Sequence, residues 1–148
     1  MFFLNTYLTH NRLSSAASDA SSPGGSAAGS STLLDEAALN RLRELDPTGA
    51  NQLMPRVLAA FDASLTRLMP QLALAQSAMD CNAIRHVAHT LKSSSASIGA
   101  LHLSRLCAEL ETAARGGELD SLDAGVNAMR AECALVLRAA KQSFTANP

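Results

Sequence analysis

The sequence contains few aromatic residues and no tryptophan: one tyrosine and four phenylalanines make up 3% of its 148 residues. Phe2, Phe3 and Tyr7 fall at the N-terminus, which leaves only Phe61 and Phe144 for the rest of the chain. Sheets depend heavily on aromatic and β-branched side chains, so this shortage argues against an all-β fold. The abundance of leucine and alanine favours packed helices instead.

Long apolar runs, excess charge and paired cysteines are also missing. No run of about 18 apolar residues occurs, so we expect no membrane span. The net charge of −1 excludes a general binder of nucleic acid, because phosphate backbones require a large basic excess. Three cysteines spaced 26 residues apart form neither a zinc pattern nor a disulfide framework. The N-terminus lacks the basic residues of a signal peptide, and we therefore expect a cytoplasmic protein with reduced thiols.

The composition divides the chain into two parts. All but two of residues 14–31 are serine, alanine or glycine, and such a segment cannot bury enough apolar surface to fold. The sequence therefore predicts a flexible N-terminal extension and linker over 1–31 and a folded domain over 32–148. The first 13 residues could form a docking helix or touch a membrane, but no spacing in them is specific. We favour an extension without a function.

Apolar residues recur with a helical period throughout the predicted domain. Asp80 is a good N-cap, and Gly99 and Gly117 are good helix ends. The connections are short, which favours antiparallel neighbours, so the sequence predicts an all-α, up-down four-helix bundle with a short N-terminal capping helix. The predicted helices span about 33–45, 51–79, 81–98, 101–115 and 119–144. The expected core includes Ile84, Leu91, Ile98, Leu103, Leu106, Leu110, Val126 and Met129.

One histidine lies in an unusual setting on the third predicted helix. Arg85 precedes His89 by four residues and Lys92 follows it by three, which places all three on one solvated face. Serines crowd the positions after Lys92, although serine is a mediocre residue for a helix interior. A partner that must approach the backbone closely would explain this run of small side chains.

The turn at Gly99 makes the third and fourth predicted helices an antiparallel hairpin, in which equal offsets from the turn meet. This register places His89 opposite Glu111, whose carboxylate would hold Nδ1–H and leave Nε2 as an exposed nucleophile. Lys92 lies one turn away, ready to meet an anion. These groups suit the acceptance of a phosphoryl group, which requires positioning and charge neutralisation. The same register pairs Lys92 with Ala108, Ala96 with Ser104, and Arg85 with Arg115.

Two other interpretations of His89 remain open from the spacing alone. It could be a surface histidine with an incidental neighbour. His86 and His89 also have the i, i+3 spacing of two metal ligands, but further ligands would have to come from elsewhere, and we expect no metal site.

The segment from His89 to Ala100, HTLKSSSASIGA, strongly resembles the signature of histidine-containing phosphotransfer (HPt) domains. That signature runs His-x-Leu-Lys-Gly/Ser-Ser and ends in an apolar residue followed by Gly-Ala. Ser93 stands where glycine is commoner in the family. The resemblance covers roughly residues 33–144. Further positions that resemble family landmarks are Leu34-Asp35, Phe61, Asp80, Ala88, Leu106-Cys107 and Leu110-Glu111.

The resemblance implies a phosphocarrier of a multi-step phosphorelay rather than an enzyme. His89 would accept the phosphoryl group on Nε2, Lys92 would neutralise its charge, and Glu111 would orient the imidazole. The implied partners are receiver domains of a hybrid histidine kinase and of a response regulator, and we expect a monomer. The chain has no acidic cluster for Mg²⁺, so we expect it to need no cofactor and the metal to belong to the partner receiver.

Two further groups of residues complete the expected docking surface. Small side chains would allow close approach of the receiver, and basic side chains would steer its acidic surface. An alternative function is a helical adaptor or scaffold that binds receiver domains without carrying phosphate. A third is the phosphoacceptor module of a larger kinase. The expected close-approach residues are Ser93, Ala96, Ser104 and Ala108, and the expected steering residues are Arg85, Arg105 and Arg115.

Overall fold

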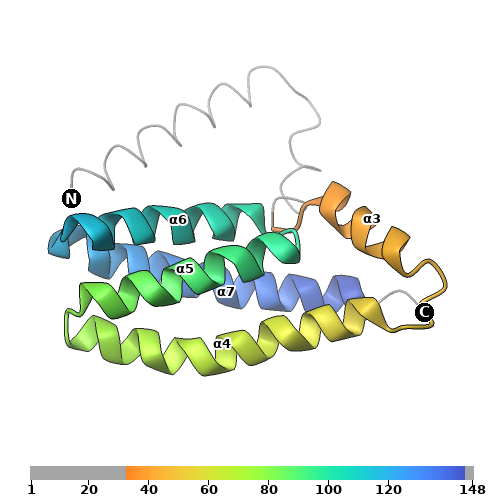
Figure 1. Cartoon of the computed structure of the whole chain (residues 1–148), viewed down its shortest axis with the longest axis horizontal. Helices are drawn as coiled ribbons and strands as arrows, with labels where there is room; N and C mark the ends of the chain where they lie inside the picture. The colour runs from red at the N-terminus through yellow and green to blue at the C-terminus, as the bar shows by residue number, and fades with distance from the viewer. Residues whose placement is uncertain (1–32, 146–148) are drawn as a thin grey trace, which may run out of the picture.

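The computed structural model describes residues 33–145, and all of its helices lie within that range. The predicted extension over 1–31 falls outside the described residues. Four long helices run alternately up and down beside one another, and a short helix lies at one end of them (Figure 1). The predicted all-helical bundle with a short N-terminal helix is confirmed. The helices are α3 (Glu36–Leu45), α4 (Leu53–Ser77), α5 (Cys81–Ser97), α6 (Leu101–Gly116) and α7 (Leu119–Thr145).

Side-chain caps account for the starts of two helices. The carboxylate of Asp35 accepts a hydrogen bond from Ala38 N–H at the start of α3, and Asp80 accepts one from Ala83 N–H at the start of α5. Each cap satisfies one of the N–H groups that have no partner inside the helix. Since Asp80 was predicted as a cap from the sequence, the helix that carries His89 begins where it was expected.

The start of α4 depends on a residue from the preceding loop. Gln52, the N-cap residue, has a left-handed backbone (φ 51°) and makes no capping side-chain bond. The carboxylate of Asp46 instead accepts hydrogen bonds from the N–H groups of Leu53 at 3.0 Å and Asn51 at 3.2 Å. These bonds, the one from Leu53 above all, lower the pKa of Asp46.

The core is built from apolar residues of all five helices, and leucine predominates in it. Leu72, Leu91 and Leu103 are completely buried, from α4, α5 and α6 respectively. Leu106 was expected in the core but is only half-buried. Leu103, Cys107, Leu110 and Ala114 already form the inward stripe of α6, and Leu106 lies to one side of that stripe.

The short helix α3 is fixed to the turn between α5 and α6. Asp35 N–H donates a hydrogen bond of 2.7 Å to the carbonyl of Gly99. Gly99 has φ +83°, and a β-carbon there would lie 3.0 Å from the β-carbon of Ala38. Glycine is therefore required for both the conformation of the turn and the close approach of α3. In the part of the chain that the structure describes, no helix is long and apolar enough to cross a membrane.

Candidate functional site

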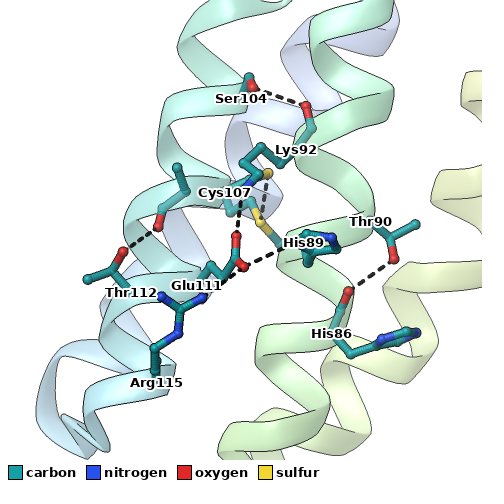
Figure 2. Close-up of polar contacts among 11 residues, drawn as sticks. His86, His89, Thr90, Lys92, Ser104, Cys107, Glu111, Thr112 and Arg115 are labelled. Atoms are coloured by element: carbon teal, nitrogen blue, oxygen red, sulfur yellow. Dashed lines mark hydrogen bonds and ion pairs between the residues drawn. The ribbon is translucent and has the colours of Figure 1, made fainter.

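The candidate site lies across the α5–α6 hairpin, whose turn fixes the register of the two helices. Ala100 N–H donates to the carbonyl of Ser95 at 2.9 Å, and Gly99 N–H donates to that of Ala96 at 3.1 Å. The two helices then run back side by side, and their facing residues are His89 on α5 and Glu111 on α6 (Figure 2). The sequence placed these two residues opposite each other, and the structure brings them together.

His89 has one ring nitrogen held and the ring itself exposed. Its Nδ1 lies 3.0 Å from Glu111 Oε1, while 63% of the His89 side chain is exposed against 9% of the Glu111 side chain. Among the described residues, Nε2 has no hydrogen-bond partner. A carboxylate on Nδ1 selects the tautomer with its proton on Nδ1, which leaves the lone pair on Nε2. The arrangement therefore presents a nucleophilic nitrogen to solvent.

Glu111 connects three side chains rather than one. Lys92 Nζ donates to its Oε2 at 2.7 Å, and Arg115 Nη2 donates to its Oε1 at 3.3 Å (Figure 2). The hydrogen bond from Lys92 lowers the pKa of Glu111 most, that from His89 lowers it further, and burial of the carboxyl group opposes both. Glu111 therefore stays ionised at neutral pH.

Lys92 and Ser104 make hydrogen bonds that the register of the hairpin alone does not predict. Lys92 was expected opposite Ala108, but its long side chain reaches past that level to Glu111. Ser104 was expected opposite Ala96, but its hydroxyl donates to the backbone carbonyl of Lys92 at 3.0 Å. A backbone register fixes the positions of β-carbons, and these two side chains extend from there to the nearest charge or carbonyl.

Comparison with known protein families matches residues 56–139 to the Hpt domain. This chain belongs to the Hpt domain family. Among solved structures, it is similar to the histidine-containing phosphotransfer protein B (HptB) from Pseudomonas aeruginosa PAO1, with 33% sequence identity and a TM-score of 0.69. That match covers 78% of this chain and 97% of HptB. Comparison with curated proteins gives no match. The resemblance carried by the His89–Ala100 segment is thus confirmed at the level of the family, whose domains serve phosphotransfer in two-component signalling.

The small residues expected to admit a partner of this Hpt domain divide into two pairs. Ser93 and Ala96 on α5 are exposed, whereas Ser104 and Ala108 on α6 are half-buried. Ser104 lies within the contact between the two helices, where its bond to Lys92 ties them together. The open part of the predicted close-approach surface is therefore on α5.

The three arginines expected to steer a partner are all exposed. Arg115, which the register places opposite Arg85, forms an i, i+4 ion pair with Glu111 on its own helix. Arg85 and Arg105 form no ion pair within residues 33–145. Of the three arginines expected to steer a partner, these two therefore remain available to an acidic surface.

A second histidine–carboxylate pair occurs on the other side of α6, and the sequence analysis missed it. His102 Nδ1 lies 2.9 Å from Glu132 Oε1 of α7. The register of α6 and α7 is harder to derive from the sequence than that of the α5–α6 hairpin, because the pair Gly116-Gly117 leaves the exact position of the turn open. Within residues 33–145, no group of three or more His, Cys, Asp or Glu is arranged to hold a metal ion.

The three cysteines are free thiols. Cys107 and Cys133 are buried on α6 and α7, and this burial raises the pKa of each to about 12. Cys107 donates to the sulfur of Met129 at 3.4 Å. Both thiols therefore stay protonated and act as small apolar groups of the core of the Hpt domain.

Proposed function

We propose that the protein is a histidine phosphotransfer protein of a multi-step phosphorelay in which Nε2 of His89 carries the phosphoryl group. The observation that supports this most is the exposed imidazole whose Nδ1 is held by a carboxylate that is itself largely buried. The partners we propose are receiver domains, one in a hybrid histidine kinase and one in a response regulator.

The transfer step can be written with the groups of the site. The lone pair on Nε2 of His89 attacks the phosphorus of an aspartyl phosphate on the donor receiver. The N–P bond forms as the P–O bond to the aspartate breaks, and the aspartate leaves as a carboxylate. The proton on Nδ1 stays between the ring and Glu111, 3.0 Å away, whose negative charge balances the positive charge that develops on the imidazole. The reverse sequence delivers the group to a second receiver.

Lys92 is the cation we propose for the phosphoryl group. It lies one turn from His89 and is bonded to Glu111 at 2.7 Å, with about a third of its side chain exposed. A phosphoryl group on Nε2 would compete with Glu111 for this ammonium group, and the flexible stem of lysine allows the shift. We propose that the chain supplies no cofactor and that Mg²⁺ is held by the partner receiver, so transfer depends on that partner.

The test uses a receiver domain labelled on its aspartate with radioactive phosphate. Wild-type protein should take up the label in an acid-labile, base-stable form, as expected of phosphohistidine. His89→Gln should take up none. His86→Gln is the matched control, because His86 is an exposed histidine on the same helix and has no carboxylate partner among the described residues. Label on His89→Gln would overturn the assignment.

The same experiment separates the alternative function. A helical adaptor would bind the receiver equally well with His89 or with glutamine at that position, and neither protein would become labelled. Binding without label would therefore favour the adaptor over the phosphocarrier.

A further inference from the structure

The hydroxyl groups of α5 follow one rule with one exception. A serine or threonine inside a helix commonly donates its hydroxyl hydrogen to the carbonyl four residues earlier. Thr90, Ser94, Ser95 and Ser97 all do so, at distances of 2.6 to 3.3 Å. Ser93 does not, and its hydroxyl has no hydrogen-bond partner within the described residues.

The exception stands next to the candidate phosphoacceptor. Ser93 is exposed and follows His89 by four residues, so the carbonyl to which its hydroxyl does not donate is that of His89 itself. Side chains four residues apart on a helix lie on the same face with their β-carbons about 5–6 Å apart. The Cα–Cβ bonds of a helix tilt toward its N-terminus, so the hydroxyl of Ser93 extends over the turn of α5 that carries His89. A free hydroxyl thus lies on the same exposed face of α5 as the ring of His89, one turn away.

We propose that the hydroxyl of Ser93 donates a hydrogen bond to an oxygen of the phosphoryl group carried on Nε2 of His89. This inference rests on the proposed function and adds to it a residue that contacts the transferred group. No covalent bond of Ser93 changes, because the O–H remains intact and only its hydrogen-bond partner is new. Glycine, which is commoner in the family at this position, has no such donor.

The Ser93 hydroxyl gives phosphorylated His89 a hydrogen bond that unphosphorylated His89 lacks. A hydrogen bond to a charged oxygen is stronger than one between neutral groups. It therefore stabilises phospho-His89 relative to the aspartyl phosphate of the partner, and it shifts the transfer equilibrium toward this protein. The hydroxymethyl group also occupies space at the docking surface, an effect that must be separated from the hydrogen bond.

Two variants separate the effect of the Ser93 hydrogen bond from the effect of the volume of its side chain. Ser93→Ala removes the hydroxyl and keeps the β-carbon, whereas Ser93→Gly removes both. Ser97→Ala is the matched control, since Ser97 is also exposed on α5 but its hydroxyl is used by the backbone of Ser93. Alanine favours a helix, so these alanine variants should fold, and the helical circular dichroism signal checks this.

The measured quantities are the equilibrium ratio of labelled His89 to labelled receiver aspartate and the lifetime of isolated phospho-His89. Ser93→Ala and Ser93→Gly should both shift the ratio toward the receiver by about three- to tenfold, with a shorter lifetime, and Ser97→Ala should match wild type. A wild-type ratio in Ser93→Ala would overturn the inference, and a change in Ser93→Gly alone would assign the effect to bulk instead. If wild-type protein takes up no label, the proposed function fails, and this inference fails with it.

Discussion

Glu111 is the residue that determines how the other polar side chains of the site are arranged. Its carboxylate is about nine-tenths buried, yet it accepts hydrogen bonds from His89, Lys92 and Arg115. A carboxylate out of water is costly unless it is paired, and three donors supply that pairing. In return the carboxylate fixes the imidazole and holds two cations close to it. Removing this one charge would therefore disturb both the fold and the proposed chemistry.

Glu111 should make the stability of the protein depend on pH in the acid range. Its pKa is lowered in the folded state from an ordinary value of 4.5, mainly by Lys92. A lowered folded-state pKa contributes stability above the unfolded-state pKa, and that contribution is lost as the pH falls through the folded-state value. The free energy of unfolding of wild type should thus exceed that of Glu111→Gln above about pH 5. The difference should shrink below pH 4.5.

Chemical denaturation over a series of pH values measures this difference. Glu44→Gln is the control, because Glu44 is exposed and has no hydrogen-bond partner among the described residues. Its stability curve should run parallel to that of wild type. A parallel curve for Glu111→Gln as well would show that the pairing of Glu111 does not stabilise the fold.

The sequence was sufficient for one contact of the site and insufficient for two others. The contact between His89 and Glu111 could be predicted because a short turn after Gly99 fixes which residues of the hairpin face each other. The bonds made by Lys92 and Ser104 could not, because they depend on how far and in which direction a side chain extends. The free hydroxyl of Ser93 could not be predicted either, because the sequence does not show which hydroxyl groups of α5 donate to backbone carbonyls.

At the scale of helices, α3 packs closely against the α5–α6 turn, and glycine makes this close approach possible. Gly99 and Gly49 both have left-handed backbones, with φ of +83° and +71°. A β-carbon at Gly99 would lie 3.0 Å from that of Ala38 and 3.2 Å from the carbonyl of Asp35, whereas one at Gly49 would meet nothing within 4 Å. The two glycines therefore have the same type of backbone conformation, but only Gly99 is crowded by neighbouring atoms.

Gly49→Ala should lower the free energy of unfolding by about 1 kcal/mol, the cost of a left-handed conformation for a residue with a β-carbon. Gly99→Ala should cost about 1–3 kcal/mol more, because α3 must move away from the turn. Urea denaturation of the two variants gives the difference directly. Equal losses of unfolding free energy in the two variants would mean that α3 can move away from the turn without destabilising the fold.

The ends of the helices could be predicted where one residue caps its own helix. Asp80 caps the start of α5 and Gly117 caps the end of α6, so both of these helix ends could be predicted from the sequence. The start of α4 was expected near residue 51 but lies at Leu53, after Gln52 in a left-handed conformation. Its cap, Asp46, belongs to the preceding loop, and a contact that closes a loop leaves no periodic pattern in the sequence.

For the whole molecule, the small net charge conceals an uneven distribution. Between Asp80 and Glu109 the chain contains no acidic residue, but it contains Arg85, Lys92 and Arg105. Lys92 is neutralised by Glu111, whereas Arg85 and Arg105 are exposed without ion pairs in the described part of the chain. The α5–α6 face is thus basic although the protein as a whole is almost neutral, and such a face attracts an acidic partner surface during approach.

Reversing one charge on this face should slow association with a receiver domain more than reversing one elsewhere. Arg85→Glu should lower the association rate constant about three- to tenfold at low salt, because the attraction becomes a repulsion. Arg130→Glu changes the net charge equally, but Arg130 is an exposed residue of α7 and not of the hairpin, so this variant should have little effect. Stopped-flow association at several salt concentrations compares the two.

The association rate constants of the two variants should converge near 1 M salt, where charges are screened beyond about 3 Å. Equal effects at low salt would mean that the receiver responds to net charge alone, and an effect of Arg85→Glu that persists at high salt would mean that Arg85 makes a direct contact instead of steering.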